Sequence, residues 1–170
     1  KESARRILYL EHAQEQGARL EGLVKGLLNL SRLETGQPGP EAAPLVLNHL
    51  LAEQEEQFAS RAEQAGRSLN ITIPDVPVTI TGNHLQLRQA ITNLFENALK
   101  FTPQGGEIKI ELSHPQGEAV ITVADTGIGV PPEDLPHLFE RFHRGRNASA
   151  YPGSGLGLAI TRAIVHAHGG

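Results

Sequence analysis

A stretch rich in proline and glycine divides this chain into two parts that must fold differently. Three proline and two glycine residues lie between Thr35 and Pro44, and they forbid a continuous helix or a central strand there. The stretch predicts a linker over residues 35–43. It separates a helical segment, residues 1–34, from a longer domain over residues 44–170.

The segment before the linker has the hydrophobic spacing of a long helix. Ala13, Leu20 and Leu27 lie seven residues apart, and Leu23 and Leu30 lie three residues after the last two of these. These are the a and d positions of a short heptad pattern. One helix cannot bury such a stripe alone, so the pattern predicts a helical bundle that another segment or a second chain completes.

The composition predicts a folded domain without disulfide bonds. Hydrophobic residues make up 39% of the chain and charged residues 20%, a balance that permits a buried core and argues against disorder. The chain has no cysteine, which excludes cysteine-based zinc sites and fits a reducing compartment. No apolar run approaches the roughly 18 residues needed to span a membrane. We expect this domain to be cytoplasmic, with any membrane anchor in other parts of the parent protein.

The charge argues against a nucleic acid partner. The formal net charge is −4, whereas binding to a phosphate backbone needs an excess of lysine and arginine. Five phenylalanines and two tyrosines also offer few surfaces on which single-stranded bases could stack.

Segments of strand and helix character alternate after the linker. The last two expected strands flank the turn His114–Gly117 and predict a hairpin. Together the segments predict an α+β fold, a two-layer sandwich with helices on one face of a mixed sheet. We expect strands over 45–47, 68–73, 78–81, 107–113 and 119–124, and helices over 48–65, 83–101 and 155–168, with Asn48 and Asn83 as possible N-caps.

The helix over 83–101 carries a polar stripe opposite its apolar face. Asn93, Glu96, Asn97 and Lys100 cover an arc of roughly 100°. A solvated face would show the same polarity, but asparagine is a poor helix former there. Amide oxygens can join the shell of Mg²⁺, and a lysine one turn away can reach a phosphate. The apolar face is expected to contain Leu87, Ile91, Leu94, Ala98 and Phe101.

A glycine-rich turn follows the strand that ends near Asp125. Two glycines, Gly127 and Gly129, allow a ligand to approach the backbone. A buried Asp125 could accept a hydrogen bond from an exocyclic amine such as that of adenine. A tight turn requiring positive φ is the simpler interpretation of this pattern taken alone.

A second glycine-rich segment leads into the last helix. Gly153, Gly155 and Gly157 precede a helix whose unpaired N–H groups could bind an anion. The segment lacks the Gly-Lys-Ser/Thr of a Walker A loop, and no strand follows it as in a dinucleotide-binding unit.

The segment between the two glycine-rich turns combines aromatic and basic residues. Phe139 and Phe142 are spaced to anchor a short helix, and Arg144 is one of three arginines that could approach phosphates. Residues 147–152 have the composition of a mobile lid. The alternative is a loop with two core phenylalanines and a solvated basic rim.

The order and spacing of these motifs resembles the N, G1, F and G2 boxes of sensor histidine kinases. The four boxes correspond to Asn93–Pro103, Asp125–Gly129, Phe139–Phe142 and Gly153–Leu158. The resemblance covers residues 44–170 and implies the fold of the histidine kinase, gyrase and Hsp90 ATPases. Residues 27–34 resemble the second helix of the family's dimerisation and phosphotransfer hairpin.

The resemblance implies ATP and Mg²⁺ as cofactors and assigns roles by position. Asn97 coordinates Mg²⁺, Asn93 lies near the metal and the phosphates, and Lys100 contacts phosphate. Asp125 binds the adenine amine. The remaining expected contacts of the nucleotide are Gly127, Ile128 and Gly129 at the base, Phe139 and Phe142 at the lid base, His143 and Arg144 facing the nucleotide, Gly153, Gly155 and Gly157 at the phosphates, and Leu156 and Leu158 as apolar neighbours of the base.

The implied activity is transfer of the γ-phosphate of ATP to a histidine outside this chain, and then to an aspartate of a response regulator. Related ATPases carry a glutamate at the place of Asn93, and an amide cannot act as a general base. None of the eight histidines shows the family's acceptor pattern. A homodimer through the helical hairpin is also implied. Alternatives are a catalytically silent nucleotide-binding scaffold or, less favoured, an ATPase of the same fold.

The sequence also ends before the strands that usually complete the sheet in this family. We therefore expect the catalytic domain to lack its C-terminal strands in this chain.

Overall fold

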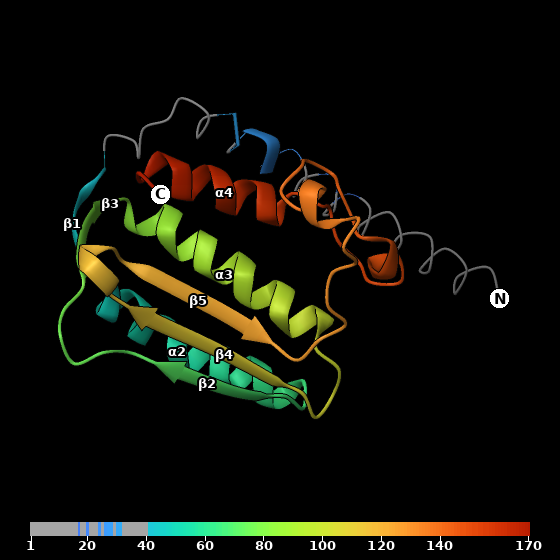
Figure 1. The fold of residues 1–170 in the computed structure, drawn as a ribbon, viewed down its shortest axis with the longest axis horizontal. Coiled ribbons are helices and arrows are strands. Elements are labelled where there is room, and N and C mark those ends of the chain that lie inside the picture. The colour runs from blue at the N-terminus through green and yellow to red at the C-terminus, as the bar shows by residue number, and fades with distance from the viewer. Residues whose placement is uncertain (1–16, 18–19, 21–23, 25, 29, 32–40) are drawn as a thin grey trace, which may run out of the picture.

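The computed structural model describes residues 17, 20, 24, 26–28, 30–31 and 41–170 (Figure 1). Its elements follow the order strand, helix, two strands, helix, hairpin and helix, with short 3-10 turns between them. None of the helices in the described part of the chain is long and apolar enough to cross a membrane.

A three-stranded mixed sheet forms one layer of the domain. Strand β4, Glu107–Ser113, lies in the centre. It pairs in parallel with β2, Ser68–Thr72, and antiparallel with β5, Val120–Asp125. The hairpin between β4 and β5 closes through the 3-10 turn η1, Pro115–Gly117. Alternate residues of β4 are buried, as period-2 side-chain alternation requires. The predicted hairpin and mixed sheet are confirmed.

Three helices form the second layer. Helix α2, Leu47–Gln64, packs against β2, and α3, His84–Phe101, packs against β5. Helix α4, Gly157–Ala167, runs alongside α3 (Figure 1). The C-terminal end of α3 and the first turn of α4 therefore lie at the same end of the domain. This arrangement confirms the two-layer α+β sandwich.

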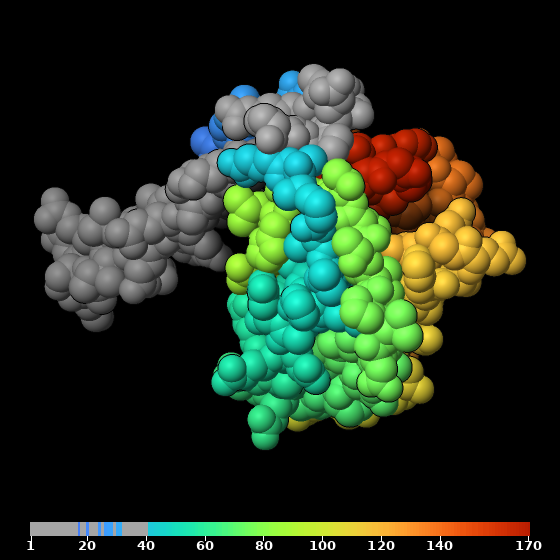
Figure 2. Space-filling view, turned by 90° about the vertical axis from the view of Figure 1, so that its left-hand side faces the viewer, coloured from blue at the N-terminus to red at the C-terminus, as the bar shows by residue number. Residues whose placement is uncertain are grey.

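A two-stranded sheet closes the opposite end. Strand β1, Ala43–Val46, pairs antiparallel with β3, Thr79–Gly82. Figure 2 shows this end, with β1 in cyan and the red end of α4 beside the green residues that follow β3. At this junction the Nε2 atom of His168 accepts the main-chain N–H of Asn83 at 3.0 Å. The bond connects the end of α4 to the start of α3.

The two predicted N-caps differ in outcome. The side chain of Asn83 accepts the N–H of Gln86 at 3.1 Å, so it caps α3 as predicted. Asn48 was predicted to cap α2, and that prediction is wrong, because Val46 is the N-cap residue. The side chain of Asn48 instead accepts the N–H of Val78 at 2.8 Å. Its role is to hold the loop between β2 and β3.

The apolar face of α3 is wider than the spacing predicts. Phe95 and Ala90 are buried, whereas the predicted core residues Leu94 and Phe101 are only partly buried. Phe95 stacks on Phe58 of α2 with ring centroids 4.1 Å apart. Because α2 and the sheet cover one side of α3 and α4 covers another, a single 3.6-residue stripe does not describe its burial.

The described residues of the N-terminal segment are helical. Leu30 lies in the domain core, and a Cβ on Gly26 would come within 3.2 Å of the Leu156 side chain. Leu20 and Leu27 are exposed. The heptad positions Ala13 and Leu23, and residues 35–40 of the predicted linker, lie outside the described residues.

Candidate nucleotide site

Four parts of the chain meet at the end of the domain where α3 ends and α4 begins. They are the last two turns of α3, the turn after β5, the segment over 131–154 and the first turn of α4 (Figure 1). The segment over 131–154, drawn in orange, includes the 3-10 turns η2, Leu135–His137, and η3, Arg146–Ala148. We call residues 143–154 the lid.

Asn93 joins α3 to the first turn of α4. Its side-chain amide donates to the main-chain carbonyl of Gly157 at 3.2 Å. The hydroxyl of Thr161 donates to the same carbonyl at 3.0 Å. The Oδ1 atom of Asn93 makes no hydrogen bond within the described residues. Asn93 can therefore bind Gly157 and still offer an oxygen to a cation.

The polar residues of α3 do not all face the nucleotide site. Asn97 is partly buried, one turn after Asn93, and its amide has no hydrogen-bond partner among the described residues. Glu96 points the other way, because its carboxylate lies 3.0 Å from the guanidinium of Arg61 on α2. The ion pair assigns Glu96 to the contact between α2 and α3 rather than to the nucleotide site.

Lys100 lies where the end of α3 meets the lid. Its Nζ atom is 4.4 Å from the centre of the Phe101 ring. A Cβ on Gly153 would come within 2.7 Å of the same atom, so the lid backbone passes close to the ammonium. Burial lowers the pKa of Lys100, and the nearby charge of Arg144 lowers it further. No carboxylate among the described residues pairs with Lys100, so an anion would find an uncompensated cation there.

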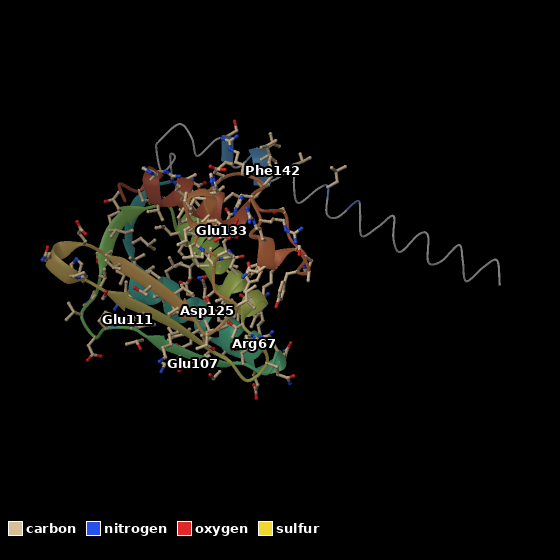
Figure 3. The ribbon with its side chains drawn as sticks, turned by 45° about the vertical axis from the view of Figure 1, so that its right-hand side comes forward. Arg67, Glu107, Glu111, Asp125, Glu133 and Phe142 are labelled. Carbon is tan, nitrogen blue, oxygen red and sulfur yellow. The ribbon has the colours of Figure 1, made fainter. Side chains whose placement is uncertain are left out.

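Asp125 ends β5 and begins the turn that was predicted to bind adenine (Figure 3). Its side chain is exposed, so the expectation of a buried carboxylate is wrong. The N–H of Gly127 donates to Oδ1 of Asp125 at 2.8 Å. This bond leaves Oδ2 free to accept a hydrogen bond. The N–H of Ile128 donates to the carbonyl of Phe101 at 3.2 Å, so the turn is held against the end of α3.

Two of the predicted glycines are required by their surroundings. A Cβ on Gly127 would lie 2.5 Å from Oδ1 of Asp125 and 2.6 Å from the carbonyl oxygen of Phe101. Gly155 has a φ of +72°, and a Cβ there would lie 2.7 Å from the backbone of Phe142. The N–H of Phe142 donates to the Gly155 carbonyl at 3.0 Å. The first close approach holds the turn after β5 against the end of α3, and the second brings together the two residues that flank the lid.

The two phenylalanines of the predicted lid base are not core residues. Phe139 is 43% exposed and Phe142 is 57% exposed. Phe142 also adopts a φ of +62°, an uncommon value for a bulky residue. Its backbone contacts Gly155. The Arg162 guanidinium lies 6.0 Å from the Phe139 ring.

Arg144 is exposed, and its guanidinium folds back onto the lid. One of its guanidinium nitrogens donates to the carbonyls of Ala148, at 2.9 Å, and Ser149, at 3.3 Å, and also to that of Tyr151. The bonds bend the lid around the guanidinium. Its positive charge is nevertheless close enough to lower the pKa of Lys100.

His143 faces Asp134, which is buried. The His143 Nε2 atom lies 3.6 Å from Oδ1 of Asp134. The other carboxylate oxygen of Asp134 accepts the N–H of Arg146 at 2.9 Å. His137 lies nearby, with its ring centre 5.7 Å from that of His143. His137 also pairs with Glu140, and this hydrogen bond is the main cause of the lowered pKa of Glu140.

The apolar residues expected beside the base have different environments. Leu156 is 2% exposed and belongs to the domain core. Leu158 is partly buried and Ile128 is exposed. The side chain of Leu156 lies against the N-terminal helical segment at Gly26.

Three residues that shape this site were not predicted from the sequence to have a role in it. Asn147 donates to the carbonyl of Gly129 at 3.0 Å and so ties the lid to the turn after β5. The ring of Tyr151 contacts that of Phe101. Asp134 holds Arg146 and faces His143. None of the three belongs to a motif by spacing, and their contacts arise from the path of the lid.

The residues at this end of the domain fit a nucleotide with a divalent cation. The described part of the chain contains no group of three or more histidine, cysteine or acidic side chains that could hold a metal. The available ligands are amide oxygens of Asn93 and Asn97, which suit a hard cation that keeps water and phosphate oxygens in its shell. The uncompensated charge of Lys100 and the free N–H groups at the start of α4 suit phosphates.

Comparison with known proteins gives the class of this domain. Residues 82–170 match the family described as histidine kinase-, DNA gyrase B-, and HSP90-like ATPase, and the chain therefore belongs to this family. Among its relatives is the sensor histidine kinase RppB of Synechocystis sp., 39% identical over 95% of this chain and 36% of the relative. Another is the phosphate regulon sensor protein PhoR of Pseudomonas aeruginosa, 40% identical over 94% of this chain and 36% of the relative. The chain thus spans about a third of their length.

Solved structures agree with the sequence relatives. Full-length ShkA, crystallised in complex with AMPPNP, aligns with 95% of this chain and 34% of its own at a TM-score of 0.78 and 31% identity. The mycobacterial sensor histidine kinase MprB aligns with 75% of this chain and 82% of its own at a TM-score of 0.67 and 31% identity. The resemblance to the ATP-binding catalytic domain of sensor histidine kinases, and the fold that it implied, are confirmed.

Proposed function

We propose that this chain supplies the ATP-binding catalytic part of a sensor histidine kinase, which transfers the γ-phosphate of Mg-ATP to a histidine outside the chain. The observation that carries the proposal is the placing of Asn93, Asn97 and Lys100 on α3 beside the first turn of α4. This placing brings two amide oxygens, one ammonium and the free N–H groups of a helix start to the same end of the domain.

Each group has a distinct task in this proposal. Asn97 and the Oδ1 atom of Asn93 hold Mg²⁺, which neutralises phosphate charge when bound. Lys100 and the N–H groups at the start of α4 bind phosphate oxygens and orient the γ-phosphate for attack by an imidazole nitrogen. The free Oδ2 of Asp125 accepts the adenine amine, as the base-binding turn requires. The charge of Arg144 adds positive potential beside Lys100.

Phosphoryl transfer to histidine is favoured over hydrolysis of ATP because position 93 carries an asparagine, which cannot act as a general base. Its amide donates to Gly157 and cannot take a proton from water. The neighbouring carboxylate of Glu96 is paired with Arg61 on α2. Neither side chain is therefore suited to activate a water molecule beside the phosphates.

The complete protein is proposed to act with partners that lie outside this chain. An aspartate of a response regulator receives the phosphate. The exposed leucines of the N-terminal helical segment, Leu20 and Leu27, suit a homodimeric helical bundle. This domain would act in the cytoplasm, with any membrane anchor elsewhere in the parent protein, and we propose no nucleic acid partner.

The experiment is phosphorylation of the full-length protein with γ-labelled ATP and Mg²⁺. We expect label that is labile in acid and stable in base, as for a phosphorylated histidine. Asn97→Ala should abolish it, because the metal loses an oxygen ligand. Purified response regulator should then remove the label from the wild-type kinase.

Glu96→Gln is the matched control, because Glu96 is adjacent in sequence yet faces α2. It should label as well as the wild type. A protein that binds ATP without becoming labelled would overturn the kinase proposal and favour a nucleotide-binding scaffold. Release of free phosphate that persists when the acceptor histidine is replaced would favour an ATPase.

A further inference from the structure

The ring of Tyr151 joins the lid to the last residue of α3. Its centre lies 5.1 Å from that of Phe101, and the planes are 62° apart, an edge-to-face contact. Such pairs are favoured by the opposite charges of a ring's edge and face. Both side chains are partly buried. This is the aromatic contact between the lid and α3 in the described part of the chain.

Phe101 occupies a central place in the nucleotide site. Its carbonyl accepts the N–H of Ile128, in the turn proposed to bind adenine. The face of its ring lies 4.4 Å from the ammonium of Lys100, which is proposed to bind phosphate. A lid residue that contacts Phe101 can therefore influence both the base and the phosphate ends of the site.

The backbone beyond Tyr151 continues this contact. Gly153, two residues later, passes so close to Lys100 that a Cβ there would lie 2.7 Å from the ammonium. Within the lid, the guanidinium of Arg144 donates to the carbonyl of Tyr151. Lys100 is thus enclosed by the ring of Phe101 and by the part of the lid that Tyr151 and Arg144 hold. The enclosure agrees with the lowered pKa of Lys100, for which burial is the larger cause.

We propose that Tyr151 is a positioning residue that acts through Phe101 to hold the lid over Lys100 and so keeps the ammonium at the phosphate end of the site. This inference rests on the proposed function and adds a residue that no motif contains. Tyr151 makes no contact with the reacting atoms in this proposal. It sets the place of the lid backbone before nucleotide arrives, which lowers the ordering cost of binding.

The first test needs no nucleotide. Amide hydrogen exchange over residues 146–153 is compared in the full-length wild type, Tyr151→Ala, Tyr151→Phe and the control Ala150→Ser, an exposed neighbour in the lid. Loss of one aromatic pair should speed exchange about three- to tenfold in Tyr151→Ala. Tyr151→Phe keeps the ring and should exchange like the wild type, as should Ala150→Ser.

The second test measures ATP affinity by titration calorimetry. Tyr151→Ala should weaken ATP binding roughly fivefold, whereas Tyr151→Phe and Ala150→Ser should leave it unchanged. In Tyr151→Ala the decline of affinity at alkaline pH should also move to higher pH, because Lys100 regains solvent and separates from Arg144. A purely structural role of Tyr151 would not shift this pH profile. Thermal unfolding of each variant shows that the domain stays folded.

The outcomes separate this inference from the proposed function. Wild-type exchange rates and affinity in Tyr151→Ala would overturn the role of Tyr151 while leaving the nucleotide site intact. Equal defects in Tyr151→Phe and Tyr151→Ala would assign the effect to the hydroxyl group and would also overturn it. A wild-type protein that binds no ATP would overturn both proposals.

Discussion

Asn93 and Gly157 share a hydrogen bond that joins two helices at the nucleotide site. The amide of Asn93 on α3 donates to the carbonyl of Gly157, the first residue of α4, at 3.2 Å. Thr161 donates to the same carbonyl from within α4. The bond places the free N–H groups of the α4 start beside the polar stripe of α3. The side chain of Asn93 thus makes a structural contact through its nitrogen and offers its oxygen, which we propose as a metal ligand.

Asn93→Asp should separate these two roles. Aspartate keeps an oxygen for a cation but has no donor for Gly157, and its negative charge would face the carbonyl. We expect the free energy of unfolding to fall by about 1–3 kcal/mol, the range for an unpaired polar contact. Urea unfolding without nucleotide measures it. Glu96→Gln, which breaks an exposed ion pair one turn away, should change stability by less than about 1 kcal/mol. Equal losses in the two variants would contradict the role of the Gly157 bond.

Gly127→Ala should damage the base-binding turn specifically. The new Cβ would lie 2.5 Å from Oδ1 of Asp125 and 2.6 Å from the Phe101 carbonyl oxygen, so the turn must move away from α3. We expect ATP affinity, measured by titration calorimetry, to fall on the order of tenfold, as for the loss of one good polar contact. Gly105→Ala is the control. Gly105 has a φ of +80° and open space around it, so alanine there should cost about 1 kcal/mol in stability and leave affinity unchanged.

His168→Phe should destabilise the end of the domain remote from the nucleotide. The Nε2 atom of His168 accepts the N–H of Asn83 at 3.0 Å, and its Nδ1–H donates to the carbonyl of Ile164 at 2.7 Å. Phenylalanine keeps an aromatic ring but leaves the N–H of Asn83 unpaired, whereas the Ile164 carbonyl still accepts the main-chain N–H of residue 168. We therefore expect a loss of about 1–3 kcal/mol in urea unfolding. His166→Gln, on an exposed position of the same helix, should be neutral. A neutral His168→Phe would show that the junction of α3 and α4 does not depend on this bond.

ATP binding at alkaline pH should take up a proton at Lys100. Burial and the charge of Arg144 lower the pKa of Lys100 in the free protein. A bound phosphate favours the ammonium and raises the pKa again. Between the two values the complex holds a proton that the free protein has lost, so affinity falls as pH rises through this range. Calorimetric titrations at alkaline pH, in buffers of different ionisation enthalpy, measure the uptake.

Lys100→Gln should abolish this proton uptake and weaken binding at every pH. Lys109→Gln is the control, because Lys109 on β4 is exposed and pairs with Glu107 at 3.4 Å. It should retain both the uptake and the affinity. Uptake of the same size in Lys100→Gln would assign the proton to another group.

Several features of this protein follow from the amino-acid sequence alone. The alternation of strand and helix segments, the hairpin through His114–Gly117 and the cap at Asn83 are set by local patterns and turn chemistry, which short stretches of chain carry. The order of the asparagine-rich helix and the two glycine-rich turns identified the family. The same order predicted Asn93, Asn97 and Asp125 as residues of the nucleotide site.

Only the tertiary structure decided what each of these residues touches. Helical spacing placed Glu96 and Asn97 on one polar stripe. In the structure, however, Glu96 forms an ion pair with Arg61 of α2 and not with a group at the nucleotide site. The family resemblance placed Leu156 beside the base, whereas in the structure its side chain is part of the buried core. The contacts of Arg144 and Tyr151 depend on the path of the lid over α3. Periodicity records the direction of a side chain from its own backbone, whereas the packing of distant segments determines which group it meets.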